Sequence, residues 1–143
     1  MDIASILLSA AKSVGVSGSL LLAICSHESN GFRVNHVAHD KGSPSYGVCQ
    51  IKEKTARNLG FTGKAVELND PKVCGEFAAK YIRYQQGIYG DDWVKVVASY
   101  NAGVYNPSNK VLGCPRNLKY IRAVQKLLPE DLKHRLDCGW RKK

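Results

Sequence analysis

The chain has 143 residues, the length of one ordinary domain, and its 44% hydrophobic and 23% charged residues are typical of a globular protein and exclude an intrinsically disordered one. The formal net charge of +9 favours polyanionic partners such as nucleic acid, an anionic membrane surface or the acidic polymers of a cell wall. No apolar stretch approaches the about 18 residues that a membrane-spanning helix needs, so we expect no membrane insertion.

Helical periodicity extends over almost the whole chain, and capping residues mark where the helices begin and end. Asp2 is a suitable N-cap, and Gly15 a suitable stop, for the apolar residues spaced three and four apart between them. Asp70 and Pro71 open the clearest helix, which ends at Gly90. The expected helices cover residues 3–14, about 20–29, 53–59, 71–89, 93 to about 100, and 117–128, with a last turn or short helix after Pro129.

Two stretches break this periodicity. Residues 31–46 are rich in Gly, Ser, His and Asn and show no period, and residues 103–115 are rich in Gly and Asn. Both predict loops, and a long loop in a compact domain often carries function. We find no predicted strand, repeat or linker, and residues 138–143 read as a basic tail. The sequence therefore predicts a single all-α domain over residues 1–143.

Five cysteines are many for a cytosolic domain of this length, and their odd number leaves at least one thiol unpaired within the chain. No two of them form a CxxC pair, which argues against a zinc ribbon. His36 and His39 lie three residues apart, but no second pair of ligands has matching spacing, so we expect neither a metal nor another cofactor. A disulfide that involves Cys114 and Cys138 is compatible with the sequence, while the pairing stays open.

Glu28 is the first candidate for a catalytic residue. It follows the apolar run at residues 20–25, and Asn30 with Gly31 forms a helix stop, so the sequence places this carboxylate at a helix C-terminus. Partial desolvation and the unpaired carbonyls at the negative end of the helix both disfavour the charged form. Both effects raise the pKa of Glu28, as a general acid near neutral pH requires. The alternative is a solvated glutamate at the end of an ordinary amphipathic helix.

Three segments, at residues 28–32, 46–50 and 99–103, each combine small residues with polar side chains at a loop or helix end. In the third, Tyr100 and Asn101 place an aromatic hydroxyl beside an amide. Aromatic faces with amide and hydroxyl groups suit sugar rings, which have one apolar face and a rim of hydroxyls and acetamides. Any one of these segments alone is typical of an ordinary capped turn, so the argument depends on their combination and order.

In this order, the segments resemble the motifs of the soluble lytic transglycosylases, the goose-lysozyme-like branch of the lysozyme superfamily. The resemblance covers about residues 20–128 and implies a lysozyme-like, single helical domain with a substrate cleft. The matching motifs are Glu28-Ser29, Tyr46-Gly47-Val48-Cys49-Gln50-Ile51, Thr55-Ala56, Leu68-Asn69-Asp70-Pro71, Ser99-Tyr100-Asn101-Ala102-Gly103 and Asn117-Leu118-Lys119-Tyr120-Ile121.

The resemblance implies cleavage of the β-1,4 bond between N-acetylmuramic acid and N-acetylglucosamine in peptidoglycan. Glu28 is then the single general acid and base, the acetamide of the substrate stabilises the charge at the anomeric carbon, and the muramic 6-hydroxyl closes a 1,6-anhydro end. The positive net charge fits attraction to a wall polymer that carries carboxylates. By the same resemblance, the residues that hold the sugar are Ser29, Gln50, Tyr100, Asn101 and Tyr120.

Some positions depart from the family pattern. Cys49 stands where the family usually has Met, so the cleft floor is reshaped or Cys49 pairs with another cysteine. Asp40 lies near the position of the acid with which goose-type lysozymes position water, whereas Lys52 stands about where that branch has a second aspartate. The separation of the carboxyl groups decides between hydrolysis and transglycosylation, and we favour transglycosylation. In the alternative, a goose-type lysozyme that hydrolyses the bond, Asp40 is the water-positioning acid.

Two other classes of protein remain as alternatives. A wall-binding module without catalysis does not need an acid such as Glu28. A nucleic-acid binder is expected to carry a basic stripe interleaved with aromatic residues, and the positive charges here are scattered, so we expect no nucleic-acid partner.

The cellular setting is predicted from the first residues. Asp2 stands where a secretory signal peptide has a positive charge, and residues 15–19 interrupt the apolar segment, so we expect no cleaved leader. An enzyme that acts in the periplasm or cell wall would then arrive in a bacteriophage virion, by release at lysis, or as a component of a secretion machine. We favour the virion.

Overall fold

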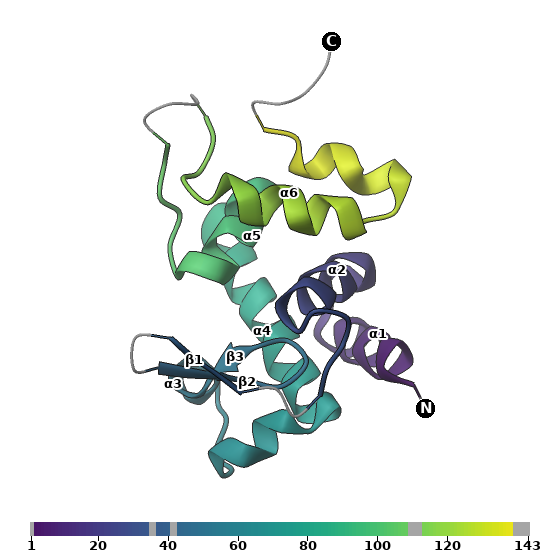
Figure 1. Ribbon diagram of the computed structural model, residues 1–143, viewed down its shortest axis with the longest axis vertical. Helices are drawn as coiled ribbons and strands as arrows, with labels where there is room; N and C mark the ends of the chain where they lie inside the picture. Colours follow the sequence, from purple (N-terminus) through teal and green to yellow (C-terminus); the bar gives the residue numbers. More distant parts are fainter. Residues whose placement is uncertain (1, 35–36, 41–42, 109–112, 139–143) are drawn as a thin grey trace. The chain divides into compact units, whose positions relative to one another are not determined.

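The protein is described by a computed structural model, which covers residues 2–34, 37–40, 43–108 and 113–138, and of residues 39, 40 and 43 it describes the backbone alone (Figure 1). These residues are mostly helical, as the sequence predicts. They group into two compact units, residues 1–83 and 84–143, and the single domain over the whole chain stays a prediction. No helix in the described part is both long and apolar enough to cross a lipid bilayer.

The first helix, α1 (Ile3–Val14), has the ends that its capping residues predict. The Asp2 carboxylate accepts a hydrogen bond from the Ser5 amide at 2.8 Å, which satisfies one of the unpaired donors of the first turn. Gly15 ends the helix in the left-handed conformation at φ 94°, which a residue without a side chain adopts at little cost.

The second helix, α2 (Gly18–Glu28), starts two residues earlier than the sequence predicts. The Ser17 hydroxyl accepts a hydrogen bond from the Leu20 amide at 3.1 Å, and this N-cap sets the start of the helix. The helix packs against α1, and its apolar side chains form much of the core of the first unit. The fully buried side chains here include Leu7, Leu20, Leu21, Ile24 and Cys25.

A small antiparallel sheet lies where the sequence predicts a loop. Its strands are β1 (Val37–Asp40), β2 (Ser43–Tyr46) and β3 (Ile51–Lys52), and β2 pairs with both of the others (Figure 1). The prediction that the chain has no strand is wrong at these residues. Strands of this length are too short to show an alternating pattern, and pairing across the hairpin stabilises them more than local propensity does.

A long helix, α4 (Pro71–Tyr89), follows two short ones, α3 (Glu53–Asn58) and the 3-10 helix η1 (Ala65–Asn69). The sequence did not predict η1. The start of α4 is as predicted, because the Asp70 carboxylate accepts a hydrogen bond from the Lys72 amide at 3.0 Å. The helix passes through the division between the two units. Its fully buried residues include Cys74, Ala78, Ala79, Ile82 and Gln85.

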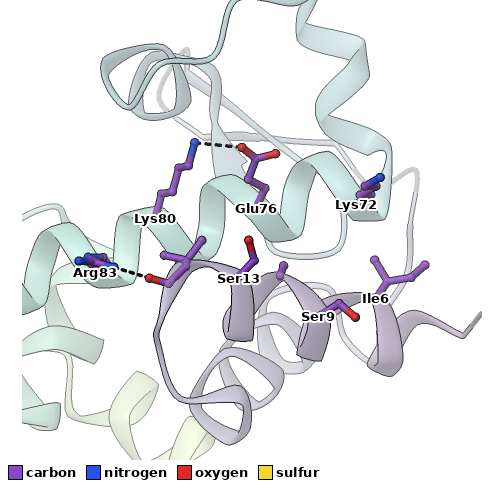
Figure 2. A pocket seen from close by; sticks show the side chains of 9 residues that line it. Ile6, Ser9, Ser13, Lys72, Glu76, Lys80 and Arg83 are labelled. Carbon is purple, nitrogen blue, oxygen red and sulfur yellow. Dashed lines mark hydrogen bonds and ion pairs between the residues drawn. The ribbon is translucent and has the colours of Figure 1, made fainter.

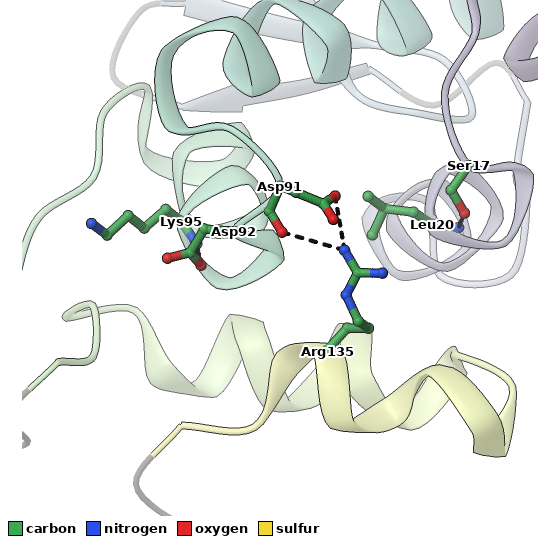
Figure 3. Close-up of polar contacts among 6 residues, drawn as sticks. All are labelled: Ser17, Leu20, Asp91, Asp92, Lys95 and Arg135. Carbon is green, nitrogen blue, oxygen red and sulfur yellow. Dashed lines mark hydrogen bonds and ion pairs between the residues drawn. The ribbon is translucent and has the colours of Figure 1, made fainter.

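In residues 84–143, two α-helices and a 3-10 helix contact one another. Figure 3 shows the residues at the start of α5 (Trp93–Ala102). The Arg135 guanidinium pairs with the Asp91 carboxylate at 2.9 Å, and the Asp92 carboxylate caps the helix by accepting from the Lys95 amide at 3.2 Å. The elements are α5 (Trp93–Ala102), α6 (Leu118–Leu127) and η2 (Glu130–Leu136), all close to their predicted positions.

A disulfide between Cys114 and Cys138 links the segment before α6 to the segment after η2, which confirms that these two cysteines form a bond. Cys138 is buried, so it belongs to the folded unit and not to the predicted basic tail. The rest of that tail, residues 139–143, lies outside the described residues.

Candidate functional site

Glu28 is the last residue of α2, which confirms its predicted place at a helix C-terminus, and its side chain is partly exposed. The helix stops there because Asn30 (φ 56°) and Gly31 (φ 95°) both adopt left-handed conformations. The Gly31 amide donates to the Ser26 carbonyl at 2.8 Å, and the Asn30 amide donates to the His27 carbonyl at 3.3 Å. This is the Schellman arrangement of a helix end, and it fixes the direction of the chain after Glu28.

These hydrogen bonds correct one part of the sequence argument about Glu28. The carbonyls of Ser26 and His27 are hydrogen-bonded, and the Cys25 carbonyl accepts from both the amide (3.0 Å) and the hydroxyl (2.9 Å) of Ser29. The sequence predicts unpaired carbonyls at this helix end. The three carbonyls are instead hydrogen-bonded, so unpaired carbonyls are not a reason for a raised pKa of Glu28. Partial burial and the negative end of the helix dipole remain as physical reasons for a raised pKa of Glu28, which stays a prediction.

Ser29 lies inside the protein. Its side chain is fully buried, and its hydroxyl donates to the Cys25 carbonyl of the same helix. Its own carbonyl accepts a hydrogen bond from the Nε of Arg33 at 3.0 Å. In this structure Ser29 holds the backbone directly after Glu28, and its predicted contact with a sugar stays a prediction.

The turn between β2 and β3 carries Gln50. Gly47 opens it with φ 76°, and a Cβ at this position would lie 2.4 Å from the Leu68 carbonyl oxygen, so a side chain there requires the backbone to shift. Gln50 also has a positive φ of 50°, and its backbone N–H (3.1 Å) and side-chain Nε2 (2.9 Å) both donate to the Gly47 carbonyl. The Gln50 amide is therefore folded back over its own turn.

A disulfide joins this turn to the helix that carries Glu28. It links Cys25 of α2 to Cys49, with Cα atoms 4.1 Å apart, so the departure from the family pattern at Cys49 is explained by a covalent partner. Cys25 precedes Glu28 by three residues and lies on the same side of the helix. Gln50 follows Cys49 directly. The carboxylate and the amide are thus each within a few residues of one crosslink.

The fifth cysteine supports the same turn. Cys74 of α4 is buried and unpaired, and its sulfur accepts a hydrogen bond from the Cys49 amide (3.3 Å) and donates to the Tyr46 carbonyl (3.4 Å). Burial raises the pKa of the Cys74 thiol to about 11, so the thiol is neutral and a poor nucleophile near neutral pH. The unpaired cysteine that the odd number predicts is therefore Cys74, and its thiol supports the turn between β2 and β3.

The other predicted sugar-binding residues lie in residues 84–143, where Tyr100 and Asn101 belong to the last turn of α5 and Tyr120 to the first turn of α6. The two tyrosines are largely buried, whereas Asn101 is exposed. Asn117, directly before α6, joins the helix ends: its Nδ2 donates to the Ala98 carbonyl at 3.1 Å and to the Asn101 Oδ1 at 2.9 Å. This contact directs the NH2 group of Asn101 away from Asn117.

The backbone after α5 is held by side chains of α4. Gln85 is buried, and its Nε2 donates to the Gly103 carbonyl at 3.5 Å. The Tyr89 hydroxyl accepts from the Tyr105 amide at 3.0 Å. A hydrogen bond with the Ser99 side chain, and next the one from the Tyr105 backbone, lower the pKa of Tyr89. These contacts fix the end of α5 without a covalent bond.

Asp40 is the last residue of β1, where its backbone pairs with Ser43 across the hairpin. Its side chain is not described, so its predicted part in positioning water stays a prediction. The same holds for the histidines considered as metal ligands, because the side chain of His39 and the whole of His36 lie outside the described residues. In the part of the chain that the structure does describe, no three His, Cys, Asp or Glu residues gather as a metal site.

Two supports of the candidate site do not follow from the sequence. Asn117 was recognisable as a polar residue directly before a helix, but nothing local indicates its contact with Asn101 on another helix. The bond between Cys25 and Cys49 was signalled only by the number of cysteines, since connectivity does not follow from spacing.

Comparisons with known proteins show which family the chain resembles. Residues 5–116 match the family model described as the transglycosylase SLT domain, a range that includes Glu28, Gln50 and Asn101 and ends before Tyr120. Protein IpgF of Shigella sonnei is 32% identical over 120 residues, which cover 80% of this chain and 73% of that protein. Protein IpgF of Shigella flexneri is 31% identical over 119 residues, with the same coverage of both chains.

Proposed function

The chain belongs to the transglycosylase SLT family, and we propose that it is a lytic transglycosylase that cleaves the β-1,4 bond between N-acetylmuramic acid and N-acetylglucosamine in peptidoglycan. The observation that carries the proposal is the placement of Glu28. It ends α2, and the chain after it is fixed by the Schellman arrangement and the buried Ser29. A general acid acts only when its carboxyl group is held within reach of the leaving oxygen, and the fixed backbone after Glu28 supports such positioning.

Glu28 first donates its proton to the glycosidic oxygen while the bond from that oxygen to the anomeric carbon breaks. The acetamide of the muramic acid stabilises the positive charge that develops at this carbon, as in other substrate-assisted glycosidases. The Glu28 carboxylate then accepts the proton of the muramic 6-hydroxyl, whose oxygen attacks the anomeric carbon. The reaction consumes no water and leaves a 1,6-anhydro end.

The polar groups near the other motifs suit sugar binding. Asn101 is exposed and its NH2 group is aimed away from Asn117, so it is able to donate to a sugar hydroxyl or acetamide. Gln50, Tyr100 and Tyr120 complete the proposed set, with Ser29 holding the backbone beside Glu28. The net charge of +9 favours the approach of the protein to a polymer that carries carboxylates.

The main alternative is a goose-type lysozyme that hydrolyses the same bond, with Asp40 positioning the water. A catalytically inert wall-binding module is the second alternative. The two enzymes differ in their products, and the binding module releases none, so one digestion separates all three.

Purified peptidoglycan is digested with the protein, and the released muropeptides are weighed by mass spectrometry. We expect 1,6-anhydromuramic ends, one water lighter than reducing ends, and a loss of activity of about 10²–10⁴-fold in Glu28→Gln because a general acid supplies roughly that factor. Glu130→Gln, which changes an exposed glutamate of η2, is the matched control and should keep full activity.

Two results would overturn the proposal. If the wild type releases reducing ends and the Asp40→Asn variant does not, the protein is a hydrolase. A Glu28→Gln protein that lyses walls as well as the wild type removes Glu28 from the reaction.

We further propose that the enzyme meets its substrate in the periplasm or cell wall, since members of this family act on peptidoglycan. Delivery in a bacteriophage virion stays our preferred route over release at lysis or a secretion machine. Sequencing the N-terminus of the native protein tests it, because removal of a leader there would contradict the virion route.

A further inference from the structure

A groove of about 820 Å³ runs between α1 and α4 within residues 1–83 (Figure 2). This volume lies in the range of about 300–1,000 Å³ that ligand pockets occupy. None of the residues placed in the proposed reaction or sugar binding lines it, so the groove is a separate feature of the unit. Its lining residues are Ile6, Ser9, Ala10, Ser13 and Val14 of α1 and Lys72, Glu76, Lys80 and Arg83 of α4.

The α1 wall of the groove is apolar and small. Ile6, Ala10 and Val14 follow one another at intervals of four residues and form a stripe along one side of the helix, about 12 Å long. Ser9 and Ser13 lie beside this stripe and add two hydroxyl groups. Such a wall accepts methyl groups and offers hydrogen bonds, but it has no ring on which a sugar could stack.

The α4 wall is basic, with three cationic side chains and one carboxylate. The Glu76 carboxylate is paired with the Lys80 ammonium at 2.9 Å. Arg83 uses one of its N–H groups to donate to the Val14 carbonyl at the end of α1, which leaves further donors of the same guanidinium for a ligand. Lys72 is exposed and forms no ion pair among the described residues, so its ammonium is available to an anion.

Beside the groove, α1 and α4 approach each other closely at Gly75. A Cβ on Gly75 would lie 2.8 Å from the Cδ2 of Leu7 and 3.5 Å from the Cβ of Ala10. Leu7 is fully buried, so a side chain at position 75 would require buried groups to shift. The absence of a side chain at Gly75 therefore allows the close approach of the two helices beside the groove.

The ligand that fits these walls is short, carries carboxylates and has small apolar side chains. From Lys72 to Arg83 the basic wall is about 16 Å long, and four extended residues span at most about 14 Å. A bound helix of another protein would need roughly 800 Å² of surface on each side, more than this groove supplies. The peptide side chains of peptidoglycan are short, consist partly of alanine and carry free carboxylates.

We propose that the α1–α4 groove binds the peptide stems of peptidoglycan, with Lys72 and Arg83 contacting stem carboxylates and the Ile6–Ala10–Val14 stripe contacting alanine methyl groups. The proposal rests on peptidoglycan being the substrate class, but not on cleavage by Glu28. It predicts that the protein recognises peptide-substituted strands in preference to bare glycan.

The test uses the protein with Glu28→Gln, so that strands are not consumed during the measurement. Its binding to immobilised peptidoglycan is measured by surface plasmon resonance, with intact sacculi and with strands whose peptides an amidase has removed. We expect binding to intact sacculi to be about three- to tenfold tighter, and Lys72→Glu to remove most of that difference. Lys64→Glu, an exposed lysine outside the groove, is the matched control.

A second variant and a soluble probe complete the experiment. Ser9→Trp fills the groove without changing its charge and should weaken binding to intact sacculi alone. The free tetrapeptide L-alanyl-γ-D-glutamyl-meso-diaminopimelyl-D-alanine should displace the protein from intact sacculi. Equal binding to intact and stripped strands, or equal losses on both in Lys72→Glu, would overturn the proposal and make the groove a general site for anionic polymers.

The two proposals fail in different ways. Anhydro products from the wild type together with unchanged binding of Lys72→Glu would support the transglycosylase activity and contradict the stem-binding groove. Binding that depends on Lys72 without any released product would support the stem-binding groove and contradict the transglycosylase activity.

Discussion

The segments around Glu28 are tied by a covalent bond, whereas the segments around Asn101 are tied by hydrogen bonds. In residues 1–83, the Cys25–Cys49 disulfide links the helix of the carboxylate to the turn of Gln50. In residues 84–143, the Asn117 side chain links α5 to α6 through two hydrogen bonds. Both regions are helix ends followed by a glycine within three residues, so the difference lies in what holds the ends.

This difference fits the two tasks that we propose. Proton transfer tolerates errors of only about 0.5 Å in the position of the acid, and a crosslink one helical turn away limits such errors. Sugar binding depends on several weaker contacts that are able to adjust together. The second unit does have a disulfide, but it joins Cys114 to Cys138 and leaves Asn101 to non-covalent contacts.

The largest expected effect comes from removing the Cys25–Cys49 disulfide near Glu28. Cys25→Ser with Cys49→Ser should lower the free energy of unfolding by about 3.5 kcal/mol, as a closed loop of this length predicts, and should also lower kcat by more than tenfold. Urea unfolding and muropeptide release measure the two effects.

The matched control is Cys114→Ser with Cys138→Ser, since its loop has the same sequence separation of 24. It should lose similar stability and keep its kcat. If both pairs of substitutions reduce kcat equally, the disulfide near Glu28 has no special link to the reaction.

A smaller effect is expected from Asn117→Ala, which removes the contacts to Ala98 and Asn101. Each neutral hydrogen bond contributes about 0.5–1.5 kcal/mol, so stability should fall by about 1–2 kcal/mol and KM for peptidoglycan fragments should rise severalfold with little change in kcat. Asn58→Ala, at the exposed end of α3, is the control. A fall in kcat as large as that from losing the Cys25–Cys49 bond would contradict the comparison of the two regions.

The smallest effect concerns His27, next to Glu28. Burial lowers the pKa of His27, so the unfolded chain binds this proton more tightly than the folded one. The contribution of neutral His27 to the free energy of unfolding is therefore complete above the unfolded pKa of about 6.5. It is lost as the pH falls below that value. Urea unfolding at pH 7.5 and pH 5 should show a smaller difference in His27→Gln than in the wild type. An unchanged difference would mean that burial does not lower the pKa of His27.

The sequence by itself determined the mostly helical, lysozyme-like fold and the ends of most helices. It also determined that Glu28 stands at a helix C-terminus. These features depend on groups within about one turn of each other: Asp2 caps the amide of Ser5, and Asn30 with Gly31 ends α2. Local signals of this kind are readable because the interacting residues are near neighbours in the chain.

Only the tertiary structure decided the sheet at residues 37–52, the pairing of Cys25 with Cys49 and the contact of Asn117 with Asn101. It also decided the groove between α1 and α4, whose walls come from helices more than fifty residues apart in the sequence. Each of these joins segments whose meeting depends on how the whole unit packs. Their energies come from pairings between distant residues, and no local pattern in the sequence records which pairings the folded chain adopts.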